Sequence, residues 1–269
     1  MPATLDSILA ATRQRLFQRR HSTDLRALER AAERHSPRGF RDRLDRASEN
    51  GIAVIAELKK ASPSRGLIRA DFQPAALARD LEAAGAAALS VLTDEQYFQG
   101  SLEYLRDASS ATSLPCLRKD FIVDEFQIVE ARANAADAIL LIAAALTQPE
   151  LVSLAKSAHR HGLDVLCEAH DVAELQRAVD AGCNLIGINS RNLRTFEVTL
   201  DTALDLVGKI PAGCLRVAES GIHKGADLAR LKASGYDAFL IGESLMKAER
   251  PGKALEKLME ESRVAVETR

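Results

Sequence analysis

The chain has 269 residues, of which 46% are hydrophobic and 28% are charged, and its formal net charge is −2. This composition is typical of a globular protein, and the near-neutral charge gives no reason to expect a nucleic-acid or membrane-surface partner. No apolar run approaches the roughly 20 residues of a membrane-spanning helix, and the first residues lack the basic start and apolar core of a secretory signal.

Residues 1–48 differ from the rest in carrying eleven arginines and no lysine. Apolar residues recur there at helical spacing, which predicts an amphipathic helix over about 5–19; they are Leu5, Ile8, Leu9 and Leu16. A second helix is expected over about 23–35, capped by Ser22 or Thr23 and broken by the segment HSPRGF. We interpret the arginines as a solvated helical face.

From Gly51 onward, short β-prone runs alternate with helix-length amphipathic segments. Many of the runs follow small-residue breaks such as EAAGA, RHG, AGC or ASGY, which are typical of helix C-termini. Nearly continuous apolar strands separated by helices indicate a parallel sheet covered by helices. The eight runs cover residues 53–59, 87–93, 115–121, 137–143, 163–169, 184–190, 214–220 and 237–243.

Eight strand–helix units over about 200 residues predict an α/β fold, the closed (β/α)₈ TIM barrel. The barrel would occupy residues 49–269, and residues 1–48 would form an N-terminal helical extension that packs on it. The alternative is an open doubly wound sheet, which would carry a G-x-G-x-x-G turn after its first strand. The first run is followed by KASPSRG, which has no such turn, so we favour the barrel.

Charged and amide side chains end five of the eight runs. Residues i and i+2 of a strand share a face, so Glu57 and Lys59 point the same way as Ile55. Lys119, Glu168 and Glu219 also follow apolar residues by two positions. Because barrel active sites lie at the C-terminal ends of the strands, we expect one mouth to collect Glu57, Lys59, Lys119, Glu168, Asn189 and Glu219. Buried charges must be paired, and such a set can separate pKa values for acid–base chemistry.

Small residues follow the seventh and eighth runs, in ESGIHKG and IGESLMK. Barrels often bind a phosphate between these two loops through backbone N–H groups, which glycine allows to approach the anion closely. We therefore expect a phosphate-binding site made of Ser62, Lys59, Gly221, Gly242 and Ser244. The predicted substrate is a small phosphorylated molecule.

The cysteines and histidines predict no metal site and no cofactor chemistry. Cys116, Cys167, Cys183 and Cys214 form no C-x-x-C pair, and His159 and His161 would lie on different faces of a helix. We take the cysteines as reduced thiols of a cytoplasmic protein. Aromatic residues in the loops, Phe98 and Phe121 among them, suggest a flat apolar part of the ligand, although each taken alone is better explained by packing at the rim.

The chain resembles the indole-3-glycerol phosphate synthase family of tryptophan biosynthesis from about Leu5 to the end of the barrel. The resemblance is carried by IAELKKASPSRG, ALSVLTDEQYFQGS, LPCLRKDFIVDEFQI, INSRNLRTFEV, ESGI and IGESLM, in that order. The chain departs from the family at Ser190, where asparagine is frequent, and at Ala218, where serine is common. It also has ARANAADA where a glycine often precedes the fourth strand.

The resemblance implies a carboxy-lyase that acts on 1-(2-carboxyphenylamino)-1-deoxyribulose 5-phosphate and releases CO₂, water and indole-3-glycerol phosphate. It implies that Lys119 is the acid that polarises the ketone, and that Glu168 and Lys59 are the acid–base pair of the dehydration. The division of labour between the two lysines stays open. Glu57 and Glu219 would keep the lysines charged and contact the substrate.

The resemblance also implies the other contacts to the substrate. Asn189 would line the polar side of the site, and Arg191 would face the carboxylate; the substrate-binding set is Arg191, Ser220, Phe98 and Phe121. The N-terminal helices would fold back near the mouth and shield the substrate from water. Residues 60–70 would form a mobile loop, and no protein partner is required.

There are two alternatives to this hypothesis of function. Another phosphate-binding barrel, such as a phosphoribosyl isomerase or the tryptophan synthase α subunit, would share the phosphate site but not the combination of Glu57, Lys59 and Lys119. A degenerate barrel that only binds a ligand or a partner would be expected to lose its costly buried charges first, and here they are intact.

Overall fold

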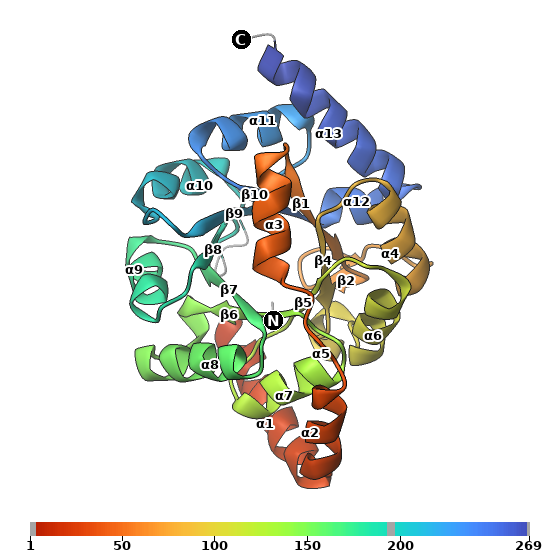
Figure 1. The fold of residues 1–269 in the computed structure, drawn as a ribbon, viewed down its shortest axis with the longest axis vertical. Helices are drawn as coiled ribbons and strands as arrows, with labels where there is room; N and C mark the ends of the chain where they lie inside the picture. The colour runs from red at the N-terminus through yellow and green to blue at the C-terminus, as the bar shows by residue number, and fades with distance from the viewer. Residues whose placement is uncertain (1–3, 193–196, 268–269) are drawn as a thin grey trace.

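The computed structural model describes residues 4–192 and 197–267. In this part of the chain, eight parallel strands close into a barrel that is surrounded by helices (Figure 1). The strands are β1 (Ala53–Leu58), β4 (Ala88–Leu92), β5 (Cys116–Lys119), β6 (Ala138–Ile142), β7 (Asp164–Ala169), β8 (Leu185–Asn189), β9 (Leu215–Glu219) and β10 (Ala238–Ile241). Each lies inside one of the eight expected runs, and β1 pairs with both β4 and β10 to close the ring. The expected (β/α)₈ barrel is confirmed.

The helices between the strands form the outer layer of the barrel (Figure 1). They are α4 (Pro74–Ala83), α6 (Leu102–Ala111), α7 (Glu125–Ala133), α8 (Gln148–Arg160), α9 (Val172–Asp180), α10 (Leu200–Leu206), α11 (Gly225–Ser234) and α13 (Pro251–Glu267). Short elements complete the loops: β2 (Ala61–Ser62), β3 (Gly66–Leu67), α5 (Glu95–Phe98), η1 (Ala143–Ala145), η2 (Val207–Lys209) and α12 (Glu243–Lys247). Among the described residues, no helix has the length and apolarity needed to cross a membrane.

Side-chain alternation along the strands separates two cores, as the period-2 pattern predicts. Four residues that precede an expected site residue by two positions belong to the interior core; they are Ile55, Leu117, Leu166 and Val217. Their sequence neighbours, such as Val54 and Cys116, belong to the core between strands and helices. The residues at the next inward position of each strand therefore reach the mouth of the barrel.

The structure contains a third N-terminal helix that the sequence pattern did not predict. The helix α3 (Phe40–Glu49) follows α1 (Leu5–Ser22) and α2 (Leu25–Glu33) and lies across one end of the barrel (Figure 1). Phe40 and Leu44 are fully buried in the interior core. The other positions of α3 are mostly polar, so its hydrophobic periodicity is too weak to show in the sequence. The N-cap of α2 is Asp24, not the expected Ser22 or Thr23.

Arginines of α1 pair with carboxylates of the loops and helices that follow the strands. Arg15 Nη2 lies 2.6 Å from Oδ2 of Asp94, whose side chain is fully buried just after β4. Arg19 pairs with the buried Glu130 of α7. Two more exposed pairs follow the same pattern, Arg13–Glu150 and Arg20–Asp124. The interpretation of these arginines as a solvated face is therefore wrong for Arg15 and Arg19, because each neutralises a carboxylate that the barrel buries.

The departure ARANAADA before β6 has a backbone consequence. Ala135 has a φ of 61°, in the left-handed region that costs a residue with a Cβ roughly 1–2 kcal/mol. A glycine at this position would adopt the same conformation without that cost.

We predict that Ala135→Gly raises the free energy of unfolding by about 0.5–1 kcal/mol, because relief of the strain exceeds the added entropy of glycine in the unfolded chain. Urea unfolding measures the change. The control is Ala10→Gly, at an exposed position inside α1, where the same substitution lowers stability by about 1 kcal/mol. A loss of stability in both variants would contradict the strain at Ala135.

We also predict that Arg15→Ala lowers the free energy of unfolding by about 1–3 kcal/mol, because the buried Asp94 is left without its partner. Adding Asp94→Asn restores most of the loss, since asparagine carries no charge and still caps α5. Arg13→Ala, which breaks an exposed pair of 3.5 Å, changes stability by less than about 1 kcal/mol. Equal effects of Arg15→Ala and Arg13→Ala would refute the special role of Arg15.

Candidate active site

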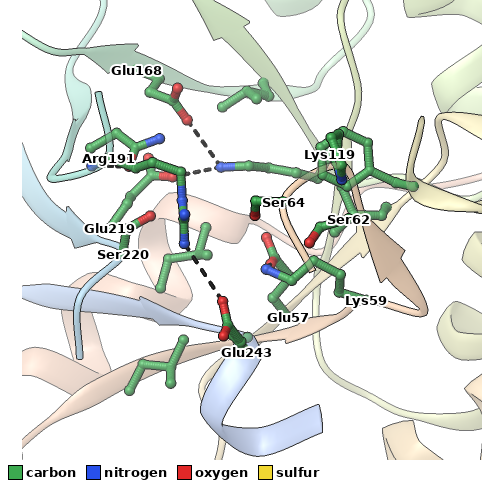
Figure 2. Close-up of a pocket in the computed structure, with 18 of the residues that line it drawn as sticks. Glu57, Lys59, Ser62, Ser64, Lys119, Glu168, Arg191, Glu219, Ser220 and Glu243 are labelled. Atoms are coloured by element: carbon green, nitrogen blue, oxygen red, sulfur yellow. Dashed lines mark hydrogen bonds and ion pairs between the residues drawn. The ribbon is translucent and has the colours of Figure 1, made fainter. Parts of the chain in front are cut away.

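One pocket opens at the C-terminal ends of the barrel strands (Figure 2). Every residue that the sequence assigns to the site lines it: Glu57, Lys59, Ser62, Phe98, Lys119, Phe121, Glu168, Asn189, Arg191, Glu219, Ser220, Gly221, Gly242 and Ser244. These side chains come from seven barrel strands or the loops after them. The barrel thus brings the complete set together, and their chemical roles remain to be assigned.

Lys119, the last residue of β5, lies between two carboxylates of other strands (Figure 2). Its Nζ donates to Glu219 Oε2 at 2.5 Å and to Glu168 Oε2 at 3.1 Å. Burial by itself would lower the pKa of Lys119, but Glu219 and Glu168 outweigh it and raise the pKa well above its ordinary value. Lys119 is therefore an ammonium ion that is held in place on two sides.

The two carboxylates around Lys119 are driven in opposite directions. Burial raises the pKa of each, but the charge of Lys119 and a contact with His170 lower the pKa of Glu168 below its ordinary range. For Glu219, burial and the neighbouring charge of Glu168 prevail over Lys119 and raise the pKa to about 7. Of the two carboxylates around Lys119, Glu168 is therefore ionised and Glu219 exchanges a proton near neutral pH.

Two glycines make room for carboxylates. A Cβ on Gly187 would overlap Glu219 Oε1, and a Cβ on Gly242 would overlap Glu57 Oε1. Glu57 in turn accepts a hydrogen bond of 2.6 Å from Lys59 Nζ. Gly242, expected only as part of a phosphate-binding loop, thus also gives Glu57 the space to reach its lysine.

The loops after β1, β9 and β10 form the opposite side of the pocket. Ser62 and Lys59 lie on the loop after β1, and the sequence did not single out Ser64, which joins them in the lining. Ser220 and Gly221 both have positive φ, 66° and 79°, so the chain turns sharply where β9 ends. Ser244 belongs to α12, and its Oγ donates to Ile222 O at 3.3 Å.

Glu243 is a charge centre on this side that the sequence did not reveal. It lies 3.0 Å from Arg65 Nε, 2.6 Å from Lys247 Nζ and 3.6 Å from Arg191 Nη2. Burial by itself would raise the pKa of Glu243, but Lys247, Arg65 and Lys59 lower it. Residues 193–196 of the motif INSRNLRTFEV lie outside the described residues.

Apolar residues cover the remaining wall. The rings of Phe98 and Phe121 lie 6.2 Å apart and are tilted by 41°. Leu5 and Ile8 of α1 also line the pocket, so the N-terminal helix contributes directly to the site. Asn189 Oδ1 accepts from the backbone N–H of Arg191 at 3.0 Å, which orients the turn after β8. In the described residues, no group of three or more His, Cys, Asp and Glu side chains could hold a metal ion.

The raised pKa of Glu219 predicts a pH dependence of stability. Folded Glu219 keeps its proton up to about pH 7, whereas an unfolded glutamate releases it near about 4.3. The folded state binds more protons in this window, so the Glu219 contribution to the free energy of unfolding falls as the pH rises through it.

The side chain of Glu219→Gln cannot titrate. The free energy of unfolding of this variant should therefore fall less steeply as the pH rises. Urea unfolding at several pH values between about 4.5 and 7.5 measures the slope. Glu260→Gln, on the exposed side of α13, is the control and keeps the slope of the original chain. An unchanged slope in Glu219→Gln would contradict the shift.

Comparisons with known proteins agree on both fold and family. A model of the indole-3-glycerol phosphate synthase family matches residues 5–258. Relatives of that name are 56% identical in Koribacter versatilis, over 96% of this chain and 100% of the relative, and 50% identical in Burkholderia vietnamiensis, over 96% and 99%. The structure of a thiamine phosphate pyrophosphorylase from Pyrococcus furiosus shares the fold alone, with a TM-score of 0.59, 18% identity and coverage of 82% and 98%. A match of this extent, on a barrel whose mouth collects all the expected residues, shows that the chain belongs to the indole-3-glycerol phosphate synthase family.

Proposed function

We propose that the pocket converts 1-(2-carboxyphenylamino)-1-deoxyribulose 5-phosphate into indole-3-glycerol phosphate, CO₂ and water, the carboxy-lyase step of tryptophan biosynthesis. Membership of the family supports the activity. The observation that carries the mechanism is the ammonium group of Lys119, held between Glu168 and Glu219 in the mouth of the barrel.

Ring closure requires an acid at the ketone. The ring carbon that bears the carboxylate is a weak nucleophile, so the C2′ carbonyl must be polarised before it is attacked. In this proposal Lys119 donates a hydrogen bond and then a proton to the carbonyl oxygen as the new carbon–carbon bond forms. Loss of CO₂ from the attacked ring carbon then restores aromaticity. Glu219 stays beside Lys119 and accepts its hydrogen bond.

Dehydration requires an acid and a base. The C2′ hydroxyl leaves as water, and a proton leaves from the neighbouring carbon of the new ring, which completes the indole. Glu168 is ionised and suits the base, while Lys59 suits the acid and is held by Glu57 at 2.6 Å. Separate pKa values for neighbouring groups are a general way to obtain both functions near neutral pH.

The remaining parts of the substrate match the other walls of the pocket. We assign the phosphate to the backbone of Gly221, Gly242 and Ser244, together with Ser62 and Lys59, as a cradle of N–H, hydroxyl and ammonium donors. Arg191 and Ser220 face the polar end, with Arg191 as the partner of the carboxylate. Phe98 and Phe121 flank the aromatic ring, and Asn189 completes the polar side.

We further propose that residues 1–48 serve the catalytic barrel of residues 49–269 as an extension that shields the substrate. The lining by Leu5 and Ile8 supports this role, because excluding water strengthens every charge in the site. The segment 60–70 would move to admit the substrate. The free thiols of the four cysteines support a cytoplasmic location.

The test is turnover by the purified chain with no added metal or nucleotide, followed by the fluorescence of the indole product. We expect Lys119→Met to lower kcat by roughly 10²–10⁴-fold, while calorimetry still detects substrate binding. Lys156→Met, at an exposed position of α8, is the matched control and keeps full activity. No indole product from the original chain would contradict the function, whereas substantial turnover by Lys119→Met would contradict only the role of Lys119.

A further inference from the structure

A histidine that the sequence did not single out contacts the base Glu168. His170 follows β7 directly, and its Nε2 lies 3.3 Å from Glu168 Oε1. The side chain is largely buried, with 14% of its surface exposed. It does not belong to the lining of the pocket, so it stands behind Glu168 and any effect on the substrate passes through that carboxylate.

The other nitrogen of His170 is fixed as well. His170 Nδ1 lies 2.9 Å from Glu174 Oε2, and the same oxygen accepts the backbone N–H of His170 at 2.9 Å. Glu174 belongs to α9, so the imidazole is anchored to the helix that follows β7. One carboxylate is hydrogen-bonded at Nδ1 and another lies at ion-pair distance from the buried Nε2. This arrangement favours the imidazolium form, which carries an N–H on both ring nitrogens.

The charges around this pair support the imidazolium form. Burial would lower the pKa of His170, but Glu168 and Glu174 raise it to about 10. The groups that face Glu168 from other elements are Lys119 of β5 and Glu219 of β9, with the neutral Asn189 of β8. His170 is therefore a second cation at Glu168, and it contacts Oε1 whereas Lys119 contacts Oε2.

Helix capping does not explain His170. The N-cap of α9 is Asp171, whose Oδ1 accepts the backbone N–H of Glu174 at 2.8 Å. The helix can thus begin without an imidazole at position 170. The start of α9 does not require the contact between the His170 ring and Glu168, so this contact has another role.

Glu168 needs two partners to be held in one orientation. The terminal torsion of a glutamate is broad and carries little intrinsic preference. Lys119 holds Oε2 at 3.1 Å (Figure 2), and His170 faces Oε1. The substrate must approach the Lys119 side, and a misplacement of about 1 Å in a catalytic group can cost as much as roughly 100-fold in rate.

We propose that His170, fixed by Glu174, is a positioning residue that holds Glu168 Oε1 so that Oε2 faces the substrate beside Lys119. The inference rests on the proposed function, because that function makes Glu168 the catalytic base. The sequence pattern E-x-H-x-x-x-E, from Glu168 to Glu174, is its signature in this chain.

The first test is kinetic. We expect His170→Ala to lower kcat by roughly 10- to 100-fold with KM changed less than about twofold, since His170 does not touch the substrate. The acidic limb of the kcat–pH profile moves to higher pH, because loss of the cation raises the pKa of Glu168. His170→Gln, which keeps an N–H donor, recovers part of kcat but not the position of the limb. His159→Ala, an exposed histidine of α8, is the control and leaves kcat and the profile unchanged.

The second test does not depend on turnover. The His170 ring is titrated by NMR in the original chain, in Glu168→Gln and in Glu174→Gln. We expect the ring to stay protonated past pH 8 in the original chain and to titrate at lower pH in each variant.

The outcomes separate the two proposals. An active original chain, with a His170→Ala variant that keeps kcat and its pH profile, would overturn the positioning role alone. Titration of His170 near its ordinary value of about 6.5 in the original chain would also overturn it, even if His170→Ala folds poorly. Absence of indole product from the original chain would overturn the proposed function, and with it the role assigned to His170.

Discussion

The site depends on one constraint, the burial of an ammonium ion between two carboxylates at the mouth of a closed barrel. Isolated buried charges are very costly, and they persist only when they are paired with good geometry. Lys119 satisfies this condition with Glu168 and Glu219, which come from strands distant in the sequence. Glu168 stays ionised because it also contacts His170, whereas burial and the charge of Glu168 make Glu219 take up a proton near neutral pH.

The surrounding backbone is shaped by these charges. Gly187 and Gly242 leave space into which Glu219 and Glu57 extend. On the outer face of β5, Arg118 is fully buried and pairs with Asp120 and with Glu130, which also meets Arg19 of α1. The strand that presents Lys119 inward is thus fixed from outside by a second charge network that continues into the N-terminal helix.

The contact with His170 gives the buried carboxylate of Glu168 a second charged partner. In the proposed mechanism Glu168 accepts a proton from one defined position, so its orientation must be fixed, and a single lysine fixes only one oxygen. The loop from β7 to α9 supplies the second partner within two residues of Glu168 and anchors it on Glu174. A cation at this place also limits the basicity of Glu168, so orientation is obtained at the expense of some proton affinity.

Much of the fold and of the site follows from the sequence alone. Period-2 alternation in eight apolar runs predicts eight strands, and parallel strands with one active end place Glu57, Lys119, Glu168, Asn189 and Glu219 at a common mouth. These are local properties of the chain combined with one general rule of the fold, so they need no knowledge of which loops touch.

Only the tertiary structure decided the contacts that join distant or irregular segments. The pair Arg15–Asp94 spans 79 positions, and no local pattern tells a buried partner from a solvated arginine. The hydrophobic periodicity of α3 is too weak to predict a helix from the sequence. Its few apolar residues are buried by the open end of the barrel and do not form a long amphipathic face. The pKa values of Glu168 and Glu219 likewise differ although both residues follow apolar strand positions. The difference comes from the contact of Glu168 with His170 and from the charge of Glu168 beside Glu219, and closure of the barrel sets both.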